Sequence, residues 1–173
     1  MLDENRIKEA EKQVRQYIEE GLLKRSLFQK EIYIILLKNA HESLDIAEFL
    51  LKHNKSDLWI IVTSYYAMYY VANTVLYKQG YKVGEKISHK ITADALIVFV
   101  RNKLKRTLLE HYEEAQREAL AGIKVDSLLE TFEMERKKRS EVQYEMKESE
   151  LHSKAKTSII RAKEFIFEME KLL

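Results

Sequence analysis

Twenty consecutive residues, from Leu58 to Tyr77, carry no charge, although 34% of the residues in the chain are charged. A run of this length is long enough to cross a bilayer. It contains five tyrosines, two threonines, a serine and an asparagine, however, and tyrosine prefers the membrane interface to its centre. A helix that is apolar nearly all round is otherwise the central helix of a bundle. We therefore predict a buried core helix and no membrane span.

Apolar residues recur at helical spacing through most of the remaining chain. The pattern predicts helices at about residues 3–20, 27–53, 89–104, 125–147 and 150–173, a loop at Tyr81–Ile87, and a less regular helical segment at 105–123. That last segment is less regular because residues 113–118 are mostly polar. No repeat, linker or low-complexity tract divides the chain, which favours one helical bundle.

Residues that favour helix ends mark several of these boundaries. Serine is a preferred N-cap residue, and we expect Ser56, Ser88 and Ser149 to cap the helices that follow them. Glycine commonly follows the last helical residue, so Gly21 and Gly80 are expected to end the first helix and the tyrosine-rich helix.

The second and the last of the predicted helices each have a defined apolar face. In the second helix, one apolar stripe contains Phe28, Ile32, Ile35, Ile46 and Leu50. In the last helix, the residues expected to face the core are Leu151, Ala155, Ala162, Ile166 and Met169. Its opposite face carries Ile160 and Phe167, which are therefore candidates for a contact with a partner protein.

Composition supports an all-α protein. The 173 residues include no proline, no cysteine and four glycines, whereas a β-rich protein needs many tight turns. We expect an up-and-down bundle with a four- to five-helix core over residues 26–173, and an added amphipathic helix over residues 1–25. The absence of cysteine fits a reducing, cytoplasmic location, and the N-terminal residues show no signal peptide. A net charge of +2 is too small to imply a polyanionic partner.

The helix predicted at 125–147 has charged residues on its apolar seam. Steps of three and four residues place these side chains on one stripe: Leu128, Phe132, Glu135, Arg139, Val142 and Met146. A buried guanidinium must be paired or must open onto a cleft. Glu135 lies one turn before Arg139 and is a suitable partner. Two interpretations follow, an internal ion pair that sets the packing of the bundle or an opening onto a binding site.

Three segments carry a resemblance to a known family: Ser64-Tyr65-Tyr66-Ala67-Met68-Tyr69-Tyr70, then Ser88-His89-Lys90, then Arg139-Ser140-Glu141-Val142-Gln143-Tyr144. Their order and spacing resemble those of the HEPN (higher eukaryotes and prokaryotes nucleotide-binding) family. The similarity extends over about residues 40–170. It implies an all-helical bundle that is usually a homodimer.

The resemblance also implies functions for the late motif. Many HEPN proteins are metal-independent ribonucleases with an Arg-x4–6-His motif, and others act together with a minimal nucleotidyltransferase in toxin–antitoxin-like pairs. Arg139 matches the motif arginine, Tyr144 takes the place of the histidine, and Glu135 and Gln143 are candidate ligand-binding neighbours. A tyrosine with a pKa of about 10 is a poor general base at neutral pH. Arg139 retains the donors needed to stabilise a phosphate.

The positions of Arg139 and Tyr144 on the helix bear on how they can act together. On an ideal helix they lie about 140° apart. They therefore converge only if the arginine bends over, the helix end distorts, or a second protomer supplies one of them. The last arrangement fits the dimer cleft that the resemblance implies.

Other candidate residues come from the tyrosine-rich helix and the loop after it. Tyr65 and Tyr69, with Tyr66 and Tyr70 as further candidates, are suited to stacking against a base, although four such positions cannot all face one cleft. His89 matches the loop histidine of the family and is either a cleft residue or a surface residue. The basic cluster of residues 101–106 can guide a phosphate backbone or simply form a solvated face. The remaining histidines show no metal-ligand spacing, so neither a metal nor a cofactor is expected.

Three functions remain open from the sequence. The first is a HEPN-like homodimer that binds nucleotide or RNA near Arg139 and Tyr144 and works with a minimal nucleotidyltransferase. The second is an active ribonuclease in which Tyr144 or His89 assists proton transfer. The third is a helical adaptor without a ligand.

Overall fold

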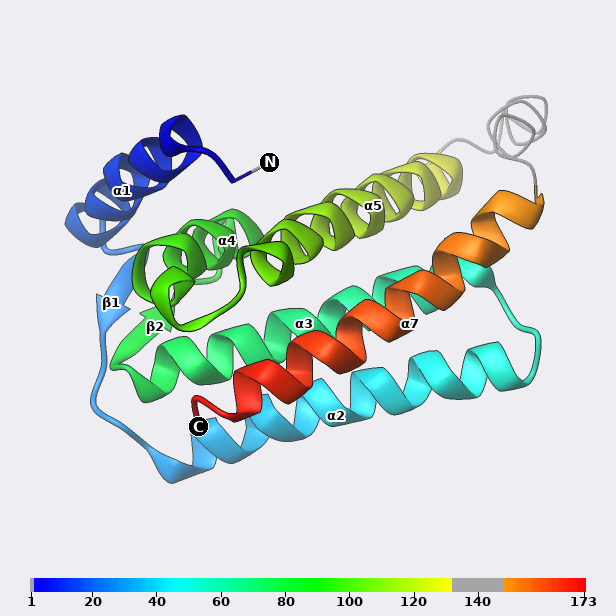
Figure 1. Ribbon diagram of the computed structural model, residues 1–173, viewed down its shortest axis with the longest axis horizontal. Coiled ribbons are helices and arrows are strands. Elements are labelled where there is room, and N and C mark those ends of the chain that lie inside the picture. The colour runs from blue at the N-terminus through cyan, green and yellow to red at the C-terminus, as the bar shows by residue number, and fades with distance from the viewer. Residues whose placement is uncertain (1, 132–147) are drawn as a thin grey trace.

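The computed structural model describes residues 2–131 and 148–173, with side chains described up to residue 124 and from residue 149 onward (Figure 1). Its elements, in chain order, are α1 (Glu4–Glu19), β1 (Leu23–Arg25), α2 (Lys30–Lys52), α3 (Asp57–Lys78), β2 (Tyr81–Val83), α4 (Ser88–Phe99), the 3-10 helix η1 (Arg101–Lys103), α5 (Arg106–Thr131) and α7 (Glu148–Glu170). The prediction of an all-α helical bundle is confirmed.

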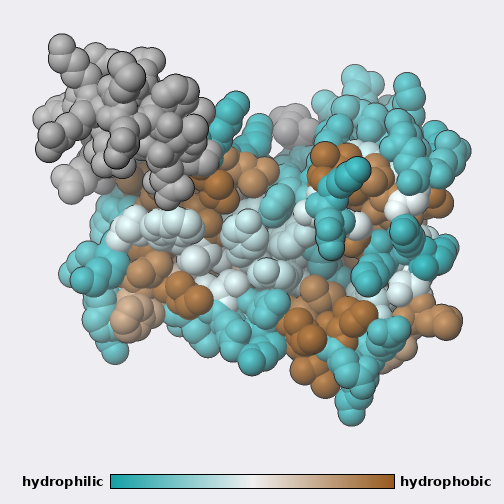
Figure 2. All heavy atoms as spheres, turned by 180° about the vertical axis from the view of Figure 1, so that it is seen from behind, coloured by the Kyte–Doolittle hydropathy of each residue, from teal (hydrophilic) through white to brown (hydrophobic). Residues whose placement is uncertain are grey.

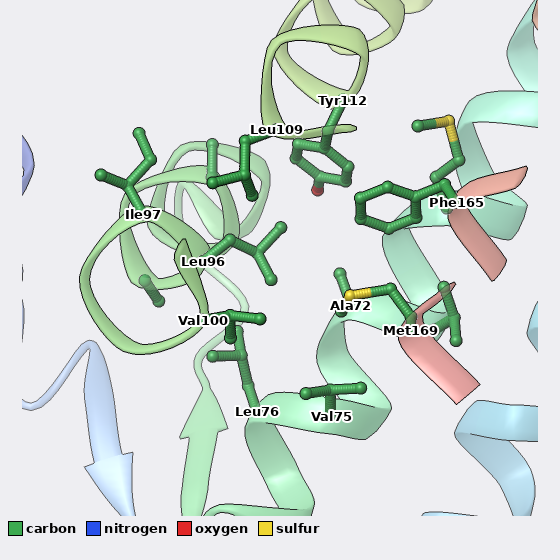
Figure 3. Close-up of a cluster of buried hydrophobic side chains, with 14 of the residues drawn as sticks. Ala72, Val75, Leu76, Leu96, Ile97, Val100, Leu109, Tyr112, Phe165 and Met169 are labelled. Atoms are coloured by element: carbon green, nitrogen blue, oxygen red, sulfur yellow. The ribbon is translucent and has the colours of Figure 1, made fainter. Parts of the chain in front are cut away.

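Helix α3 is the centre of the bundle, as its uncharged sequence predicts. It packs against α2, α4, α5 and α7 and is buried along most of its length. Figure 3 shows Ala72, Val75 and Leu76 of α3 meeting apolar side chains from α4, α5 and α7. Within the described ranges, no helix is both long enough and apolar enough to cross a membrane.

Helix α1 packs into the same core. Ala10, Val14 and Tyr17 are buried on its inner face, mostly against α4. The chain then forms β1, which pairs antiparallel with β2 so that Leu23 lies opposite Val83. The prediction of a loop at Tyr81–Ile87 is therefore wrong for its first three residues. A three-residue strand is too short to show an alternating pattern, and its partner strand lies far away in the sequence.

The predicted caps of α1 and α3 are correct, but two others are wrong. The Ser56 hydroxyl accepts a hydrogen bond from the Trp59 amide at 3.4 Å, and Gly21 and Gly80 adopt φ values of 69° and 87° after their helices. Ser88 and Ser149, by contrast, lie inside α4 and α7 rather than before them. Helix α4 therefore begins one residue earlier than side-chain preference alone indicates, with Ile87 at its N-cap position.

Helix α5 runs without interruption from Arg106 to Thr131, where the sequence predicted a less regular helical segment at 105–123 and a separate helix from about residue 125. Its buried face consists of Leu108, Leu109, Tyr112, Ala115 and Ala119. Two of these are alanines set among charged residues, so the apolar stripe was hard to recognise. The predicted helix at 89–104 is likewise shorter, because α4 ends at Phe99 and η1 follows.

Helix α2 is present, but only part of its predicted apolar stripe faces the core: Leu50 packs against a core cluster and Ile32 is partly buried. Phe28, Ile35 and Ile46 are exposed, whereas Ala40 and Ala47 are fully buried on the side that packs against the bundle. Small side chains let two helices approach closely, and a count of large apolar residues misses such a face. In α7 the predicted core face is correct, with Ala155, Ala162, Ile166 and Met169 buried and Leu151 packed partly against Ile60 and Ile61. Ile160 and Phe167 are 66% and 61% exposed, as predicted.

Candidate functional site: an aromatic cluster around His89

Six ring-bearing side chains from three helices meet beside the start of α4. We call them the aromatic cluster: Tyr65, Tyr66, Tyr69 and Tyr70 from α3, His89 from α4, and Tyr112 from α5. On α3 the four tyrosines span about one and a half turns, so their rings stay in contact with one another. The turn after β2 brings the first residues of α4 alongside them.

Three residues predicted from the sequence converge in this cluster. The Tyr65 hydroxyl and His89 Nδ1 are 2.8 Å apart and share a hydrogen bond. The rings of Tyr69 and His89 have their centroids 4.6 Å apart, and Tyr66 meets the same imidazole edge-on at 5.7 Å. Tyr65, Tyr69 and His89 therefore form one connected group, although they come from two helices.

The cluster has a buried floor and a half-exposed rim. Tyr65 and Tyr112 are 0% and 1% exposed, whereas Tyr66, Tyr69 and His89 remain partly open to solvent. Tyr70 is also partly open. Seen from behind, pale residues of intermediate hydropathy lie between brown apolar patches (Figure 2). The rim thus offers ring faces and hydroxyl groups together, a combination that can contact a planar, polar ligand.

Burial shifts the ionisation of the cluster toward neutral forms. It lowers the pKa of His89, so this imidazole is neutral at neutral pH. It raises the pKa of Tyr65 and of Tyr66, and both phenols keep their protons. Of the two imidazole nitrogens, one donates and one accepts. Whichever role Nδ1 takes toward Tyr65, Nε2 has the other role and can take part in a hydrogen bond with a ligand.

Tyr112 is a member of the cluster that the sequence did not identify as a candidate site residue. Its hydroxyl is buried and has no hydrogen bond of standard geometry among the described residues. Burial, and then the nearby Tyr65 hydroxyl, raise the pKa of Tyr112 well above its ordinary value. Spacing along the chain offered no signal for this placement, because it depends on how α5 crosses α3.

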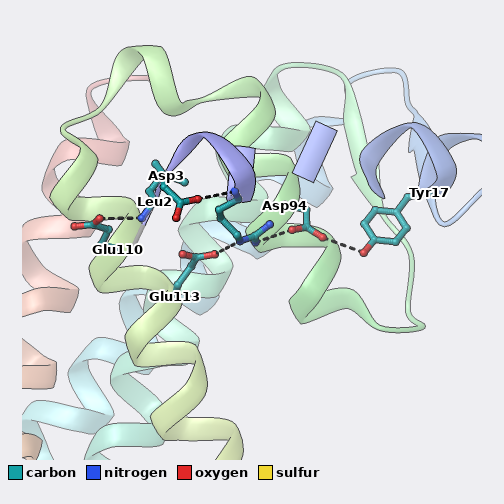
Figure 4. A network of polar contacts seen from close by, with 7 residues as sticks. Leu2, Asp3, Tyr17, Asp94, Glu110 and Glu113 are labelled. Carbon is teal, nitrogen blue, oxygen red and sulfur yellow. Dashed lines mark hydrogen bonds and ion pairs between the residues drawn. The ribbon is translucent and has the colours of Figure 1, made fainter. Parts of the chain in front are cut away.

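A second buried polar group, also missed from the sequence, joins α1 to α4 and α5 (Figure 4). Asp94 is 1% exposed; its carboxylate binds Arg6 Nη2 at 2.7 Å and accepts a hydrogen bond from the Tyr17 hydroxyl at 3.0 Å. Arg6 Nε also contacts Glu113 at 2.8 Å. Burial alone would lower the pKa of Arg6, but the hydrogen bond and the charge of Asp94 raise it. This network holds α1 in place.

Four predicted site residues lie outside the described side chains: Glu135, Arg139, Gln143 and Tyr144. The same holds for every side chain of the seam on which Glu135 and Arg139 were predicted to pair. The position of the Arg–Tyr motif relative to the aromatic cluster therefore stays a prediction.

The basic cluster at residues 101–106 does not form one uniform face. Arg101 turns toward the fold, where it donates to the carbonyl oxygens of Ile97 and Val98 and pairs with Glu11 at 3.0 Å. Arg106 pairs with Glu110 on its own helix.

In the part of the chain that the structure describes, no group of three or more histidine, cysteine, aspartate or glutamate side chains is arranged to hold a metal ion. The side chains of the cluster themselves offer ring stacking, hydrogen bonding, and proton exchange at a neutral imidazole.

Compared with protein-family models, curated proteins and solved structures, this chain has no significant match.

Proposed function

We propose that this protein binds a nucleotide or single-stranded RNA at the aromatic cluster, as a HEPN-like homodimer. The observation that carries the proposal is the half-exposed group of tyrosine rings around the neutral side chain of His89. A base can stack on the ring of Tyr66 or Tyr69. The hydroxyl groups and His89 Nε2 supply hydrogen bonds to the edge of the base or to a ribose.

The polar character of the cluster supports this proposal over a purely structural role. The partly exposed phenols pack their rings while their hydroxyl groups stay open to solvent, so the rim keeps polar groups that a ligand can bind. Base stacking on an aromatic side chain contributes about 1–3 kcal/mol per base. Stacking on two rings of the rim would contribute about 2–6 kcal/mol, to which the hydrogen bonds would add.

The test is a titration of labelled single-stranded RNA, and separately of ATP, followed by fluorescence anisotropy and calorimetry. Tyr69→Leu removes a rim ring and should weaken binding about tenfold or more, given the stacking energy above. Phe28→Leu removes an exposed ring before α2, outside both the aromatic cluster and the outer faces of α2 and α7, and serves as the matched control, with unchanged affinity expected. Absence of binding to either ligand, or equal affinity of Tyr69→Leu and the unaltered protein, would refute the proposal.

A second candidate function is metal-independent RNA cleavage. It is favoured by the lowered pKa of His89, because a neutral imidazole can accept the proton of a ribose 2′-hydroxyl. In this version Arg139 stabilises the phosphate and His89 or Tyr144 transfers protons. Incubation of purified protein with total RNA separates the two functions: cleavage that is lost in both Arg139→Ala and His89→Ala supports the enzyme, and cleavage that survives Arg139→Ala comes from another source.

The partner in the proposal is a minimal nucleotidyltransferase, inferred from the HEPN resemblance alone. A reading frame for such an enzyme beside this gene would support the pairing, and co-purification of the two proteins would test it directly. The remaining alternative, a helical adaptor without a ligand, predicts that substitutions at Tyr69, His89 and Arg139 leave every partner interaction intact.

A further inference from the structure

A pocket of about 310 Å³ lies between α1, β2 and the end of α4, and none of its lining residues belongs to the aromatic cluster. Its lining consists of Glu11, Val14, Arg15, Ile18, Tyr81, Val98, Phe99 and Arg101. The volume is at the lower end of the range for small-ligand pockets, about 300–1,000 Å³. Apolar residues predominate, and the charged residues converge on it from α1 and from η1.

The apolar wall of the pocket is held in a fixed shape. The rings of Tyr81 and Phe99 stack with centroids 4.1 Å apart and planes at 18°. The guanidinium of Arg25 lies 4.1 Å from the centroid of Tyr81. Tyr81 is therefore fixed both by a ring and by a cation. Ile18 contributes a 45% exposed side chain to the same pocket, and a ligand with an apolar body would shield it from water.

The charges around the pocket are unequal. The guanidinium of Arg101 already has partners within the protein, because it donates hydrogen bonds to the Ile97 and Val98 carbonyl oxygens and forms an ion pair with Glu11. Arg15 is exposed and forms no ion pair or side-chain hydrogen bond among the described residues. Two guanidinium groups against one carboxylate leave the pocket with a net positive charge, and the unpaired donors are those of Arg15.

We propose that this pocket binds a small carboxylate that has an aromatic or branched aliphatic body. The carboxylate pairs with Arg15, whose planar fork of donors matches its two oxygens. The apolar body lies against Ile18, Val98 and Phe99, where it displaces water from apolar surface. A cationic ligand would be repelled by the two arginines. The site is separate from the aromatic cluster, so its occupation does not depend on the proposed function.

The experiment uses phenylacetate as the charged probe and phenylacetamide as its uncharged analogue of similar shape. Each is titrated into the full-length, isotope-labelled protein and followed by backbone amide NMR. We expect saturable shifts at residues that line the pocket with phenylacetate, and about tenfold weaker binding of the amide, because a charged hydrogen-bond pair is lost.

Variants separate the pocket from general surface binding. Arg15→Gln should weaken phenylacetate binding about tenfold, and Ile18→Ser should weaken it several-fold. Both residues are exposed, so the fold should be retained, which a thermal melt checks. The matched controls are Arg117→Gln, an exposed arginine on α5, and Phe167→Ser, an exposed apolar residue on α7, and neither should alter binding. Equal affinity for the two probes, unchanged affinity in Arg15→Gln, or the absence of saturable shifts would overturn the proposal.

Discussion

At the scale of single residues, His89 combines ring contacts with a hydrogen bond at the start of α4. It is close to three tyrosine rings, and it hydrogen-bonds one of them through Nδ1. Desolvation by these rings disfavours the imidazolium form and lowers the pKa of His89. No charged side chain among the described residues pairs with it to offset this effect.

The lowered pKa makes the stability of the protein depend on pH. The unfolded chain protonates His89 near its ordinary value of 6.5, whereas the folded protein does so only at a lower pH. Between these two pKa values the unfolded state binds more protons than the folded state. The free energy of unfolding is therefore highest above the ordinary pKa of histidine and decreases as the pH falls toward the lower pKa of the folded protein. We expect His89→Asn, which does not titrate, to lose less stability than the unaltered protein between about pH 7.5 and about pH 5.

Urea unfolding of both proteins at the two pH values gives this comparison. The other histidines are present in both proteins, so their contributions cancel in the difference. Equal losses of unfolding free energy in the two proteins would contradict the prediction.

Tyr65 provides a second test at this scale. Tyr65→Phe retains the buried ring and removes the hydroxyl that binds His89 Nδ1. We expect a loss of about 0.5–1.5 kcal/mol in the free energy of unfolding, the usual contribution of one hydrogen bond. Tyr70→Phe is the control, because the Tyr70 hydroxyl forms no hydrogen bond among the described residues, and a change close to zero is expected. Similar losses in the two variants would argue against the Tyr65–His89 bond.

At the scale of elements, the attachment of α1 includes a buried charged contact beside its apolar face. Asp94 is buried in α4 and faces Arg6 and Tyr17 of α1. The desolvated carboxylate is tolerated because a guanidinium and a phenol both bind it. The β1–β2 pairing then fixes the other end of α1 to the bundle, since Leu23 and Val83 lie opposite each other.

Removal of the Arg6 side-chain charge should therefore lower the free energy of unfolding substantially. Arg6→Met leaves the Asp94 carboxylate buried with only Tyr17 as a partner, and we expect a loss of about 3 kcal/mol in unfolding free energy. The matched control is Lys38→Met, which breaks the exposed Lys38–Glu42 pair and should cost less than about 0.5 kcal/mol. Chemical denaturation measures both. A small loss in Arg6→Met would mean that α1 is held by its apolar face alone.

At the scale of the whole molecule, the outer faces of α2 and α7 carry exposed apolar side chains. Ile46 and Phe49 lie on α2, and Ile160 and Phe167 lie on α7. The pairs His41–Glu170 and Lys163–Glu48 join the two helices across their shared boundary. Exposed apolar side chains at regular spacing are typical of surfaces that contact another protein.

The proposed homodimer makes this surface testable. We expect the unaltered protein to sediment as a dimer and the variant Ile160→Ser/Phe167→Ser to sediment as a monomer, because both side chains are largely exposed in the single chain. The control is Leu27→Ser, which alters an exposed apolar residue before α2 and should leave the dimer intact. Sedimentation of the unaltered protein as a monomer would refute the homodimer, and a dimer in both variants would place its interface elsewhere.

Only part of the candidate site could be predicted from the sequence. Tyr65 and Tyr69 could be selected because tyrosines stand out in an otherwise apolar helix, and His89 because it matches the loop histidine of the HEPN family. Their hydrogen bond and ring contacts could not be predicted, because they depend on where the turn after β2 directs the start of α4. Tyr112 carries no such local signal, and it joins the cluster through the crossing of α5 over α3.

The sequence by itself determined the helices, the central place of α3 and the ends marked by Ser56, Gly21 and Gly80, because helical periodicity and capping depend on residues within a few positions of one another. The tertiary structure alone decided that α2 packs through Ala40 and Ala47, that β1 pairs with β2, and that Arg6 reaches Asp94. These features depend on contacts between residues far apart in the chain. Such contacts depend on the fit of two surfaces, and a pattern read along one segment does not contain that information.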